Sequence, residues 1–250
     1  MTQTFTGVET VLLDLDDTLW ENNLYFVRSI RWLCGVGRSH GHTDRATVAL
    51  LNRMEDRNIP HFGFGYDSYE ASYLAALRIL VARSGLENGA HAGLRRLARA
   101  QIDFLRRHPI LWLPGVPEAL ELLHRSFRTI AVTKGHFGDQ TAKVHRCGRA
   151  HLFHAVKVLP HKHESDYLGM IEEFALDPGR TVMVGNSPRS DINMAKRAGL
   201  RTIYVPHRLT WFREMEPIET HDPPTIELHG FEQVPRVLGP GGGAGDGPLA

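Results

Sequence analysis

Four short apolar segments, far apart along the chain, constrain the fold most strongly. Each is rich in β-branched residues and is bounded by Gly, Pro or charged residues, which is typical of strands buried in a parallel sheet. Helical patterns lie between them at 116–124, 167–175 and 191–199. Alternation of strand and helix predicts an α/β fold with a doubly wound parallel sheet. The predicted strands are 8–15, 128–133, 180–185 and 201–206.

The segment 21–108 has a different pattern and contains no clear buried strand. It predicts a small helical domain inserted after the first strand, with the α/β core formed by 1–20 and 109–238. The helical patterns of this insert lie at 24–34, 44–56, 68–83 and 91–107.

Two glycine-containing stretches lie outside the predicted helices and strands. HFGFGYD at 61–67 predicts an ordered loop, either a substrate contact through Phe64 and Tyr66 or a packed turn between helices. The Gly/Pro-rich stretch 239–250 has almost nothing to bury, so we expect it to be disordered.

Composition and charge exclude several classes of partner. Lys and Arg total 29 and Asp and Glu total 28, so charge gives no case for a nucleic-acid or membrane partner. No apolar run approaches the roughly 20 residues that span a bilayer. Cys34 and Cys147 form no CxxC pair, and the N-terminus lacks the pattern of a signal peptide. We therefore expect a cytoplasmic protein.

A group of aspartates follows the first predicted strand in VLLDLDDTLW, residues 11–20. Asp14 and Asp16 project to the same side if the strand continues to residue 16, and open α/β sheets bind ligands at this end. Adjacent carboxylates need a cation or a shared proton, and Mg²⁺ prefers oxygen ligands. A capping loop is the structural alternative. A calcium loop is excluded because Leu19 occupies the position that requires Gly.

DLDDTL after an apolar strand resembles the DxDxT motif of the haloacid dehalogenase-like hydrolases. Three further motifs follow in the order of that family: IAVTKG with Thr133, HKHESDY with Lys162, and VMVGNSPRSD with Asp191. The insert at 21–108 resembles the helical cap called C1. The resemblance covers about residues 8 to 215.

The resemblance implies a role for each matching residue. Asp14 would be the nucleophile that forms an aspartyl-phosphate, and Asp16 the acid and base that moves the proton. The Thr133 hydroxyl and the backbone N–H groups of Lys134 and Gly135 would bind the phosphoryl group. Lys162 would pair with Asp14 and with the phosphoryl group; Lys134 and Lys157 are rival lysines for this role. Mg²⁺ would be held by Asp14, the Asp16 carbonyl and Asp191.

Asn186 departs from the family pattern, because members often carry Asp there. Its amide oxygen still offers a contact to the metal or to a metal-bound water, so we interpret Asn186 as a tolerated variant with weaker metal affinity.

The sequence as a whole favours a Mg²⁺-dependent phosphatase acting on a small phosphorylated metabolite. Dehalogenation by the same nucleophile, a phosphomutase, and a non-catalytic binding protein on this scaffold remain open. Asp16 disfavours dehalogenation because a halide leaving group needs no acid. The sequence does not identify the substrate.

Overall fold

The computed structural model describes residues 4–82 and 88–239. These residues form two compact units. One comprises the described parts of Met1–Asn23, Ile110–Lys134 and Gln140–Ala250, and the other comprises Leu24–Pro109 with Gly135–Asp139. The sequence places Gly135–Asp139 in the core domain, whereas the contacts group this short segment with the helices. The expected disordered tail lies outside the described residues from 240 onward.

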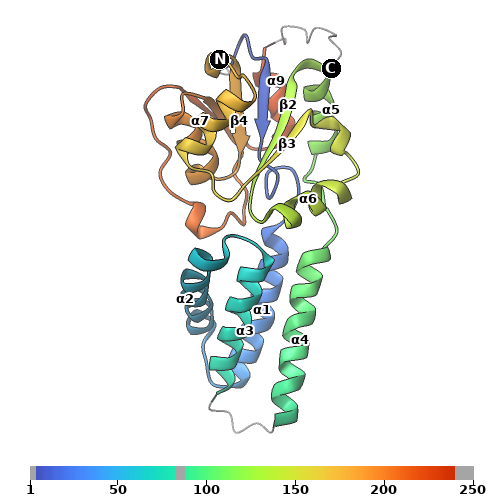
Figure 1. Ribbon diagram of the computed structural model, residues 1–250, viewed down its shortest axis with the longest axis vertical. Helices are drawn as coiled ribbons and strands as arrows, with labels where there is room; N and C mark the ends of the chain where they lie inside the picture. Colours follow the sequence, from blue (N-terminus) through green and yellow to red (C-terminus); the bar gives the residue numbers. More distant parts are fainter. Residues whose placement is uncertain (1–3, 83–87, 240–250) are drawn as a thin grey trace. The chain divides into compact units, whose positions relative to one another are not determined.

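The first unit is built on a six-stranded sheet with the order β3-β2-β1-β4-β5-β6 (Figure 1). All neighbouring strands pair in parallel. This confirms the predicted parallel α/β fold. The strands are β1 (Thr10–Leu13), β2 (Arg128–Lys134), β3 (Ala155–Leu159), β4 (Thr181–Gly185), β5 (Arg201–Tyr204) and β6 (Thr225–Glu227).

Helices cover both faces of this sheet. Leu13 of β1 packs in one apolar cluster with Leu120 of α5 and Val234 of α9, whereas Leu12 packs in another with Met170 of α7. Successive strand residues thus face opposite layers, as the pleat requires. The helices of this unit are α5 (Val116–Ser126), α6 (Phe137–Arg146), α7 (Glu164–Glu173), α8 (Met194–Arg197) and α9 (Val234–Val237).

The strands β3 and β6 and the helix α6 were not predicted. β3 pairs only with β2 and is largely half-exposed, so it lacks a continuous apolar run. β6 has three residues, of which one is buried. α6 presents a mostly polar sequence whose first residue, Phe137, is 70% exposed. Such elements are held by tertiary contacts that a local pattern does not reveal.

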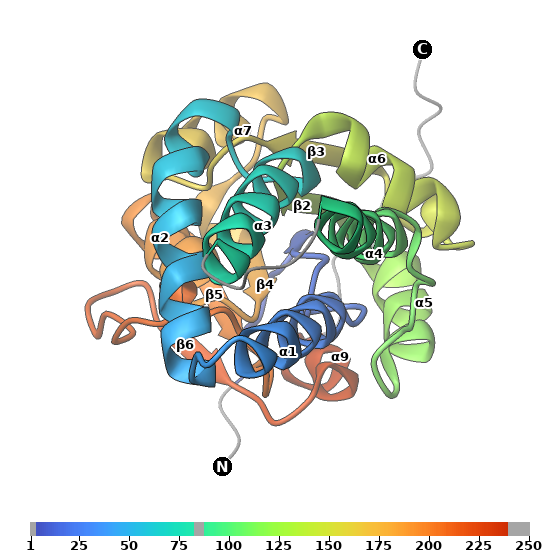
Figure 2. The ribbon, with the colours of Figure 1, turned by 90° about the horizontal axis from the view of Figure 1, so that it is seen from below.

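The second unit consists of four helices around one apolar core (Figure 2). Tyr69 and Tyr73 illustrate how the core accepts polar atoms: both hydroxyls bond to Ser29, through Oγ and the carbonyl respectively, at 2.7 Å. The helices are α1 (Asn23–Ser39), α2 (Asp44–Phe62), α3 (Tyr66–Val81) and α4 (Asn88–Arg107). None of the helices in the described ranges is both long and apolar enough to cross a bilayer.

The connection between α2 and α3 is shorter than the loop predicted at 61–67. α2 continues through Pro60 to Phe62, and Gly63 ends it with a positive φ of 71° while its N–H donates to Ile59 O. Tyr66 already begins α3. The prediction of a seven-residue loop is therefore wrong, because the helix tolerates Pro60 near its end and only the residues between Phe62 and Tyr66 connect the two helices.

Candidate active site

The loop after β1 turns away from the sheet directly after its first aspartate. The Asp14 N–H donates to Val184 O at 3.0 Å, which extends the pairing of β1 with β4 by one bond. Asp17 has a positive φ of 64°, and its carboxylate accepts the N–H groups of Asn22 and Asn23 at 2.8 and 3.0 Å. The strand does not continue to residue 16, so Asp14 and Asp16 do not project together as predicted.

Asp14 lies at the centre of a buried group of charges. The Lys162 ammonium contacts Asp14 Oδ1 at 2.6 Å and Asp191 Oδ1 at 2.7 Å, and the Lys162 side chain is 1% exposed. Burial, together with the Asp191 charge, raises the pKa of Asp14 to about 7, against the opposing effect of Lys162. Burial lowers the pKa of Lys162, but its two carboxylate partners raise it overall. Two carboxylates therefore share one ammonium.

The rival lysines have other partners. Lys134 Nζ pairs with Glu214 and donates to Ser190 Oγ at 3.1 Å, and Lys157 pairs with Glu173. Of the three candidates, Lys162 is the lysine that the fold brings to Asp14.

Asp191 is held by the loop after β4. Its Oδ2 accepts the Ser187 N–H at 2.9 Å, and a π-helical turn at Pro188–Asn193 carries it. Ser187, whose Oγ accepts the Ser190 N–H at 2.9 Å, is the cap of this turn. A Cβ on Gly185 would lie 2.3 Å from Asp191 Oδ2. Glycine at 185 therefore leaves the space that the carboxylate occupies.

Thr18 joins Asp14 to Asn186. Its Oγ lies 2.8 Å from Asp14 Oδ2 and 3.2 Å from Asn186 Oδ1, so its single proton favours the nearer carboxylate. The Asn186 amide is oriented by donation to Thr210 Oγ at 3.1 Å. No role was predicted for Thr18 from the sequence, although it is the final residue of the DxDxT pattern.

Asp16 occupies a separate environment, which we call the Asp16 cage: the side chains of Trp20, Gln140 and Lys143. Trp20 Nε1 donates to Oδ1 at 2.8 Å, while Lys143 Nζ and Gln140 Nε2 donate to Oδ2 at 2.6 and 3.1 Å. Burial raises the pKa of Asp16, but Lys143 and these hydrogen bonds lower it overall. Sequence reasoning missed the cage because α6 was not predicted.

The end of β2 supplies the predicted phosphoryl-binding segment. Thr133 is buried, and its hydroxyl donates to Gln140 Oε1 at 3.2 Å. Gly135 follows Lys134 with a φ of 143°, a conformation that favours glycine. The structure thus places Thr133 beside the Asp16 cage.

Glu214 was missed by the sequence analysis and links two of the site's loops. It accepts the Ser187 hydroxyl at 2.6 Å, the Ser190 hydroxyl, and the Lys134 ammonium. Burial raises the pKa of Glu214, but Lys134 and the hydroxyls lower it overall. No nearby sequence signal marks Glu214, since its partners come from distant segments.

Phe64 and Tyr66, predicted to contact the substrate, belong to the helical unit. Tyr66 is 4% exposed and its ring is parallel to that of Phe26, with centroids 6.1 Å apart. Its N–H donates to Asp139 Oδ2 at 3.1 Å. Phe64 is half-exposed. Tyr66 thus has a packing role within this unit, whereas Phe64 retains exposed surface.

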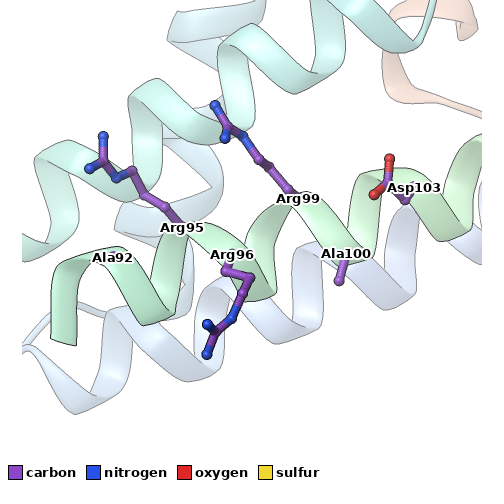
Figure 3. A pocket seen from close by; sticks show the side chains of 6 residues that line it. All are labelled: Ala92, Arg95, Arg96, Arg99, Ala100 and Asp103. Carbon is purple, nitrogen blue, oxygen red and sulfur yellow. The ribbon is translucent and has the colours of Figure 1, made fainter. Parts of the chain in front are cut away.

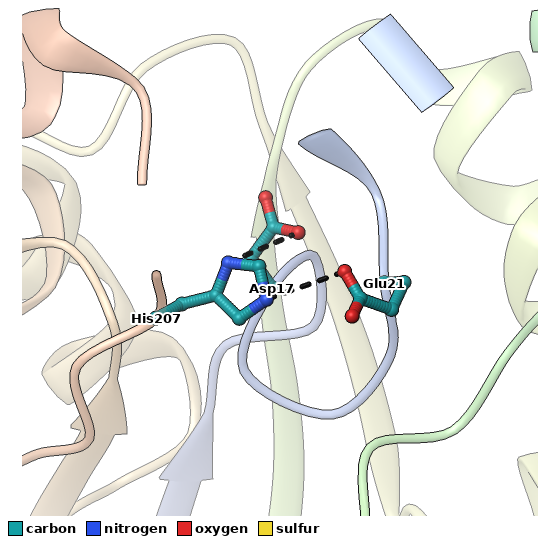
Figure 4. A group of neighbouring side chains, drawn as sticks. All are labelled: Asp17, Glu21 and His207. Atoms are coloured by element: carbon teal, nitrogen blue, oxygen red, sulfur yellow. Dashed lines mark ion pairs between the residues drawn. The ribbon is translucent and has the colours of Figure 1, made fainter. Parts of the chain in front are cut away.

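A second titratable group surrounds His207 (Figure 4). His207 Nδ1 lies 3.6 Å from Asp17 Oδ1, and Nε2 lies 3.3 Å from Glu21 Oε2. The Leu209 N–H donates to Nδ1 at 3.3 Å, which requires a lone pair there, and burial lowers the His207 pKa. Each ring nitrogen faces a different carboxylate, and Glu21 also pairs with Arg208. We interpret these contacts as structural: they hold the loop of Asp17 and Glu21 against the loop of His207.

An open hollow on α4 is lined by none of the residues assigned above. Its arginines are exposed, and Arg96 points away from Arg95 and Arg99 (Figure 3). This divergence fits a solvated helix face. The lining residues are Ala92, Arg95, Arg96, Arg99, Ala100 and Asp103.

Substitution Gly185→Ala tests the close approach of Asp191. The added methyl group has to displace the carboxylate from Lys162, so we expect the free energy of unfolding to fall by about 1–3 kcal/mol. Gly169→Ala, at a position with nothing within 4 Å, is the matched control and should be neutral or slightly stabilising. Urea unfolding measures both. Equal stability of Gly185→Ala and the parent would contradict the packing described here.

The raised pKa of Asp14 predicts a pH-dependent stability. Between its ordinary value of 3.8 and about 7, the folded protein keeps a proton that the unfolded chain loses. The contribution of Asp14 to the free energy of unfolding therefore falls as pH rises through this window. Asp14→Asn removes this loss of stability. In chelator, the melting temperature of the variant minus that of the parent should therefore be larger at pH 8 than at pH 5. For Asp103→Asn, at an exposed aspartate, this difference should be the same at pH 5 and pH 8, and the same constancy in Asp14→Asn would refute the raised pKa of Asp14.

Solved structures with the same fold support this architecture. A haloacid dehalogenase-like family hydrolase from Xanthomonas campestris is 24% identical, with a TM-score of 0.77 and 94% of each chain covered. A 2-haloacid dehalogenase from Pseudomonas syringae pv. Tomato is 22% identical, with a TM-score of 0.58 over 92% of this chain and 97% of that chain. At such identities, the similarity shows a shared fold.

A third similar structure is the putative HAD-hydrolase YfnB from Bacillus subtilis, bound to magnesium. It is 18% identical, with a TM-score of 0.59 over 92% of this chain and 98% of that chain. No curated protein sequence matches the chain.

The family model of the haloacid dehalogenase-like hydrolases matches residues 8–199. This range is more than half of the 250 residues and contains the four motifs from Asp14 to Asp191. It confirms the resemblance found in the sequence. The chain belongs to the haloacid dehalogenase-like hydrolases.

Proposed function

We propose that this hydrolase is a Mg²⁺-dependent phosphatase that cleaves a small phosphate monoester through an aspartyl-phosphate at Asp14. The observation that carries the proposal is the separation of two carboxylates. Asp14 lies against Lys162 and Thr18, while Asp16 lies against Lys143, Trp20 and Gln140. This separation supports a division of roles in which one carboxylate attacks and the other moves a proton.

The donor set around Asp14 fits Mg²⁺. Asp14 and Asp191 provide carboxylate oxygens, and Asn186 provides an amide oxygen turned toward the same hydroxyl as Asp14. Two buried carboxylates share one ammonium, so the group carries excess negative charge that a bound cation would offset. Asp14, the Asp16 carbonyl, Asn186 and Asp191 would hold the ion. When bound, Mg²⁺ would offset negative charge on the phosphoryl group.

The proposed first step follows from the contacts of Asp14. Its carboxylate attacks phosphorus, and the ester oxygen leaves with a proton that Asp16, ionised at rest, would take up from solvent and pass on. Lys162 would hold Asp14 in place and attract the phosphoryl oxygens. Thr133 and the N–H groups of Lys134 and Gly135 would donate to those oxygens.

In the second step, water attacks the phosphorus of the aspartyl-phosphate. Asp16 takes one proton from that water, and the bond between phosphorus and Asp14 breaks. Inorganic phosphate leaves, and both carboxylates return to their starting forms. The ester and one water thus give an alcohol and phosphate.

Dehalogenation is the second candidate, because several structural neighbours are 2-haloacid dehalogenases. Both reactions use an aspartate nucleophile. A halide leaves without a proton, so the elaborate anchoring of Asp16 has no use in that reaction. Asp16 therefore favours the phosphatase.

We further propose that the helical unit serves as a cap that selects the substrate. Phe64 is the better candidate contact, because Tyr66 is committed to packing beside Phe26. A cytoplasmic location remains part of the proposal, in keeping with the two unpaired, buried cysteines, Cys34 and Cys147.

Phosphate release from a panel of phosphate esters tests the function. The parent should hydrolyse at least one ester with Mg²⁺, stop in EDTA and recover when Mg²⁺ is added. Asp14→Asn should lower the rate on the order of a thousandfold or more because the nucleophile is lost. Circular dichroism should show that the variant is folded.

Halide release from 2-chloropropionate separates the two chemistries. Release of chloride from 2-chloropropionate, with no hydrolysis of any phosphate ester, would favour dehalogenation. A binding protein would turn over neither. Full ester hydrolysis by a folded Asp14→Asn protein would exclude the proposed nucleophile.

Phe64→Ala tests the role of the helical unit. Core groups would touch the phosphoryl group and the cap would touch the leaving group, so the variant should reorder the preferred esters while p-nitrophenyl phosphate slows less than about threefold. Phe62→Ala, at a neighbouring ring that is 60% exposed, is the matched control. An equal loss of kcat/KM for every ester would assign Phe64 a structural role.

A further inference from the structure

The Asp16 cage takes two of its three donors from α6. Gln140 and Lys143 are three residues apart and therefore lie on one face of that helix. The Lys143 side chain is 3% exposed, and besides Asp16 its ammonium donates to Asn22 Oδ1 at 2.9 Å. A buried lysine is costly unless it is paired, so these contacts define one position for the Lys143 ammonium.

The three donors also define one position for the Asp16 carboxylate. Trp20 holds Oδ1, while Lys143 and Gln140 hold Oδ2. A carboxylate fixed at both oxygens has lost rotation about its side-chain bonds. Proton transfer is sensitive to such positioning, because the proton must pass between atoms at hydrogen-bond distance.

We propose that Lys143 is a positioning residue that fixes Asp16 for proton transfer to the leaving oxygen and from the attacking water. This inference rests on the proposed phosphatase function. Lys143 touches neither the phosphoryl group nor the leaving group in this scheme; it acts through Asp16. Loss of Lys143 should therefore slow most the hydrolysis of those esters whose leaving group needs a proton.

Leaving-group dependence tests this inference. In Lys143→Met, kcat/KM for benzyl phosphate, whose alkoxide needs a proton, should fall at least tenfold. For p-nitrophenyl phosphate, whose phenolate leaves unaided, kcat/KM should fall less than threefold. The value of kcat/KM depends only on the steps up to and including the first irreversible one. It therefore reports cleavage of the ester bond and not hydrolysis of the aspartyl-phosphate. Lys143→Arg should recover part of the loss with benzyl phosphate.

The second step gives an independent readout. If Asp16 is misplaced, water attack slows and the aspartyl-phosphate accumulates. Lys143→Met should then show a burst of p-nitrophenol close to the enzyme concentration, absent in the parent. A merely structural role for Lys143 would lower the amount of active enzyme and would produce no burst.

A double-mutant cycle tests whether Lys143 acts through Asp16. In an Asp16→Asn background, Lys143→Met should cause less than a twofold further loss with benzyl phosphate. Lys157→Met removes a lysine of β3 that pairs with Glu173 of α7, and this matched control should behave like the parent. Additive losses in the cycle would overturn the inference.

The remaining outcomes are also decisive. Equal losses of kcat/KM for both esters, or no loss for either, would overturn the role of Lys143 while leaving the proposed phosphatase function intact.

Gln140→Met is the alternative variant if Lys143→Met fails to fold. It removes the 3.1 Å donor to Asp16 and should lower kcat/KM more for benzyl phosphate than for p-nitrophenyl phosphate, by a smaller factor than Lys143→Met. Equal effects of Gln140→Met on both esters would then overturn the inference. If the parent hydrolyses no ester, the proposed function fails, and this inference fails with it.

Discussion

The contact of one buried ammonium with two buried carboxylates is the interaction on which the site depends. Lys162 meets Asp14 and Asp191 within 2.7 Å, although the three residues come from distant parts of the chain. Asp14 and Asp191 meet because β1 lies beside β4, so that the loops at the carboxyl ends of these strands are adjacent. Lys162 reaches them from the segment between β3 and α7. The ammonium cancels only one of two charges, and removal of Lys162 would leave both carboxylates buried without a cation. Burial and the neighbouring Asp191 charge together raise the pKa of Asp14, and the excess negative charge is of the kind that a divalent ion would offset.

The same loop assigns opposite environments to two aspartates that are two residues apart. Burial dominates at Asp14 and raises its pKa to about 7, whereas Lys143 and hydrogen bonds dominate at Asp16 and lower it. The turn after β1 produces this difference, since it sends the second side chain toward α6. Asp14 and Asp16 therefore differ in electrostatic environment although they belong to one loop. The sequence shows the pair; only the tertiary structure shows the difference.

Sequence reasoning succeeded where local patterns carry the information. The strands β1, β2, β4 and β5 are short apolar runs, and their carboxyl ends hold Asp14, Thr133 and the loop of Asp191, as predicted. It failed at β3, β6 and α6, where exposure or polarity hides the element. Of the missed residues, Lys143 lies on α6, whereas Glu214 lies in the short turn Phe212–Glu214. Each reaches partners far away in the sequence, which no local spacing encodes.

Asn186 shows how charge limits what this site can contain. Its Oδ1 and Asp14 Oδ2 both lie near the single proton of Thr18, so a carboxylate at 186 would face Asp14 without a second proton between them. Two unit charges about 4 Å apart interact by about 4 kcal/mol at an effective dielectric near 20. The amide supplies an oxygen without this repulsion, and its donation to Thr210 directs that oxygen toward Thr18. With Lys162 as the one ammonium beside Asp14 and Asp191, an uncharged oxygen at 186 keeps the excess at a single negative charge, which one divalent ion more than offsets.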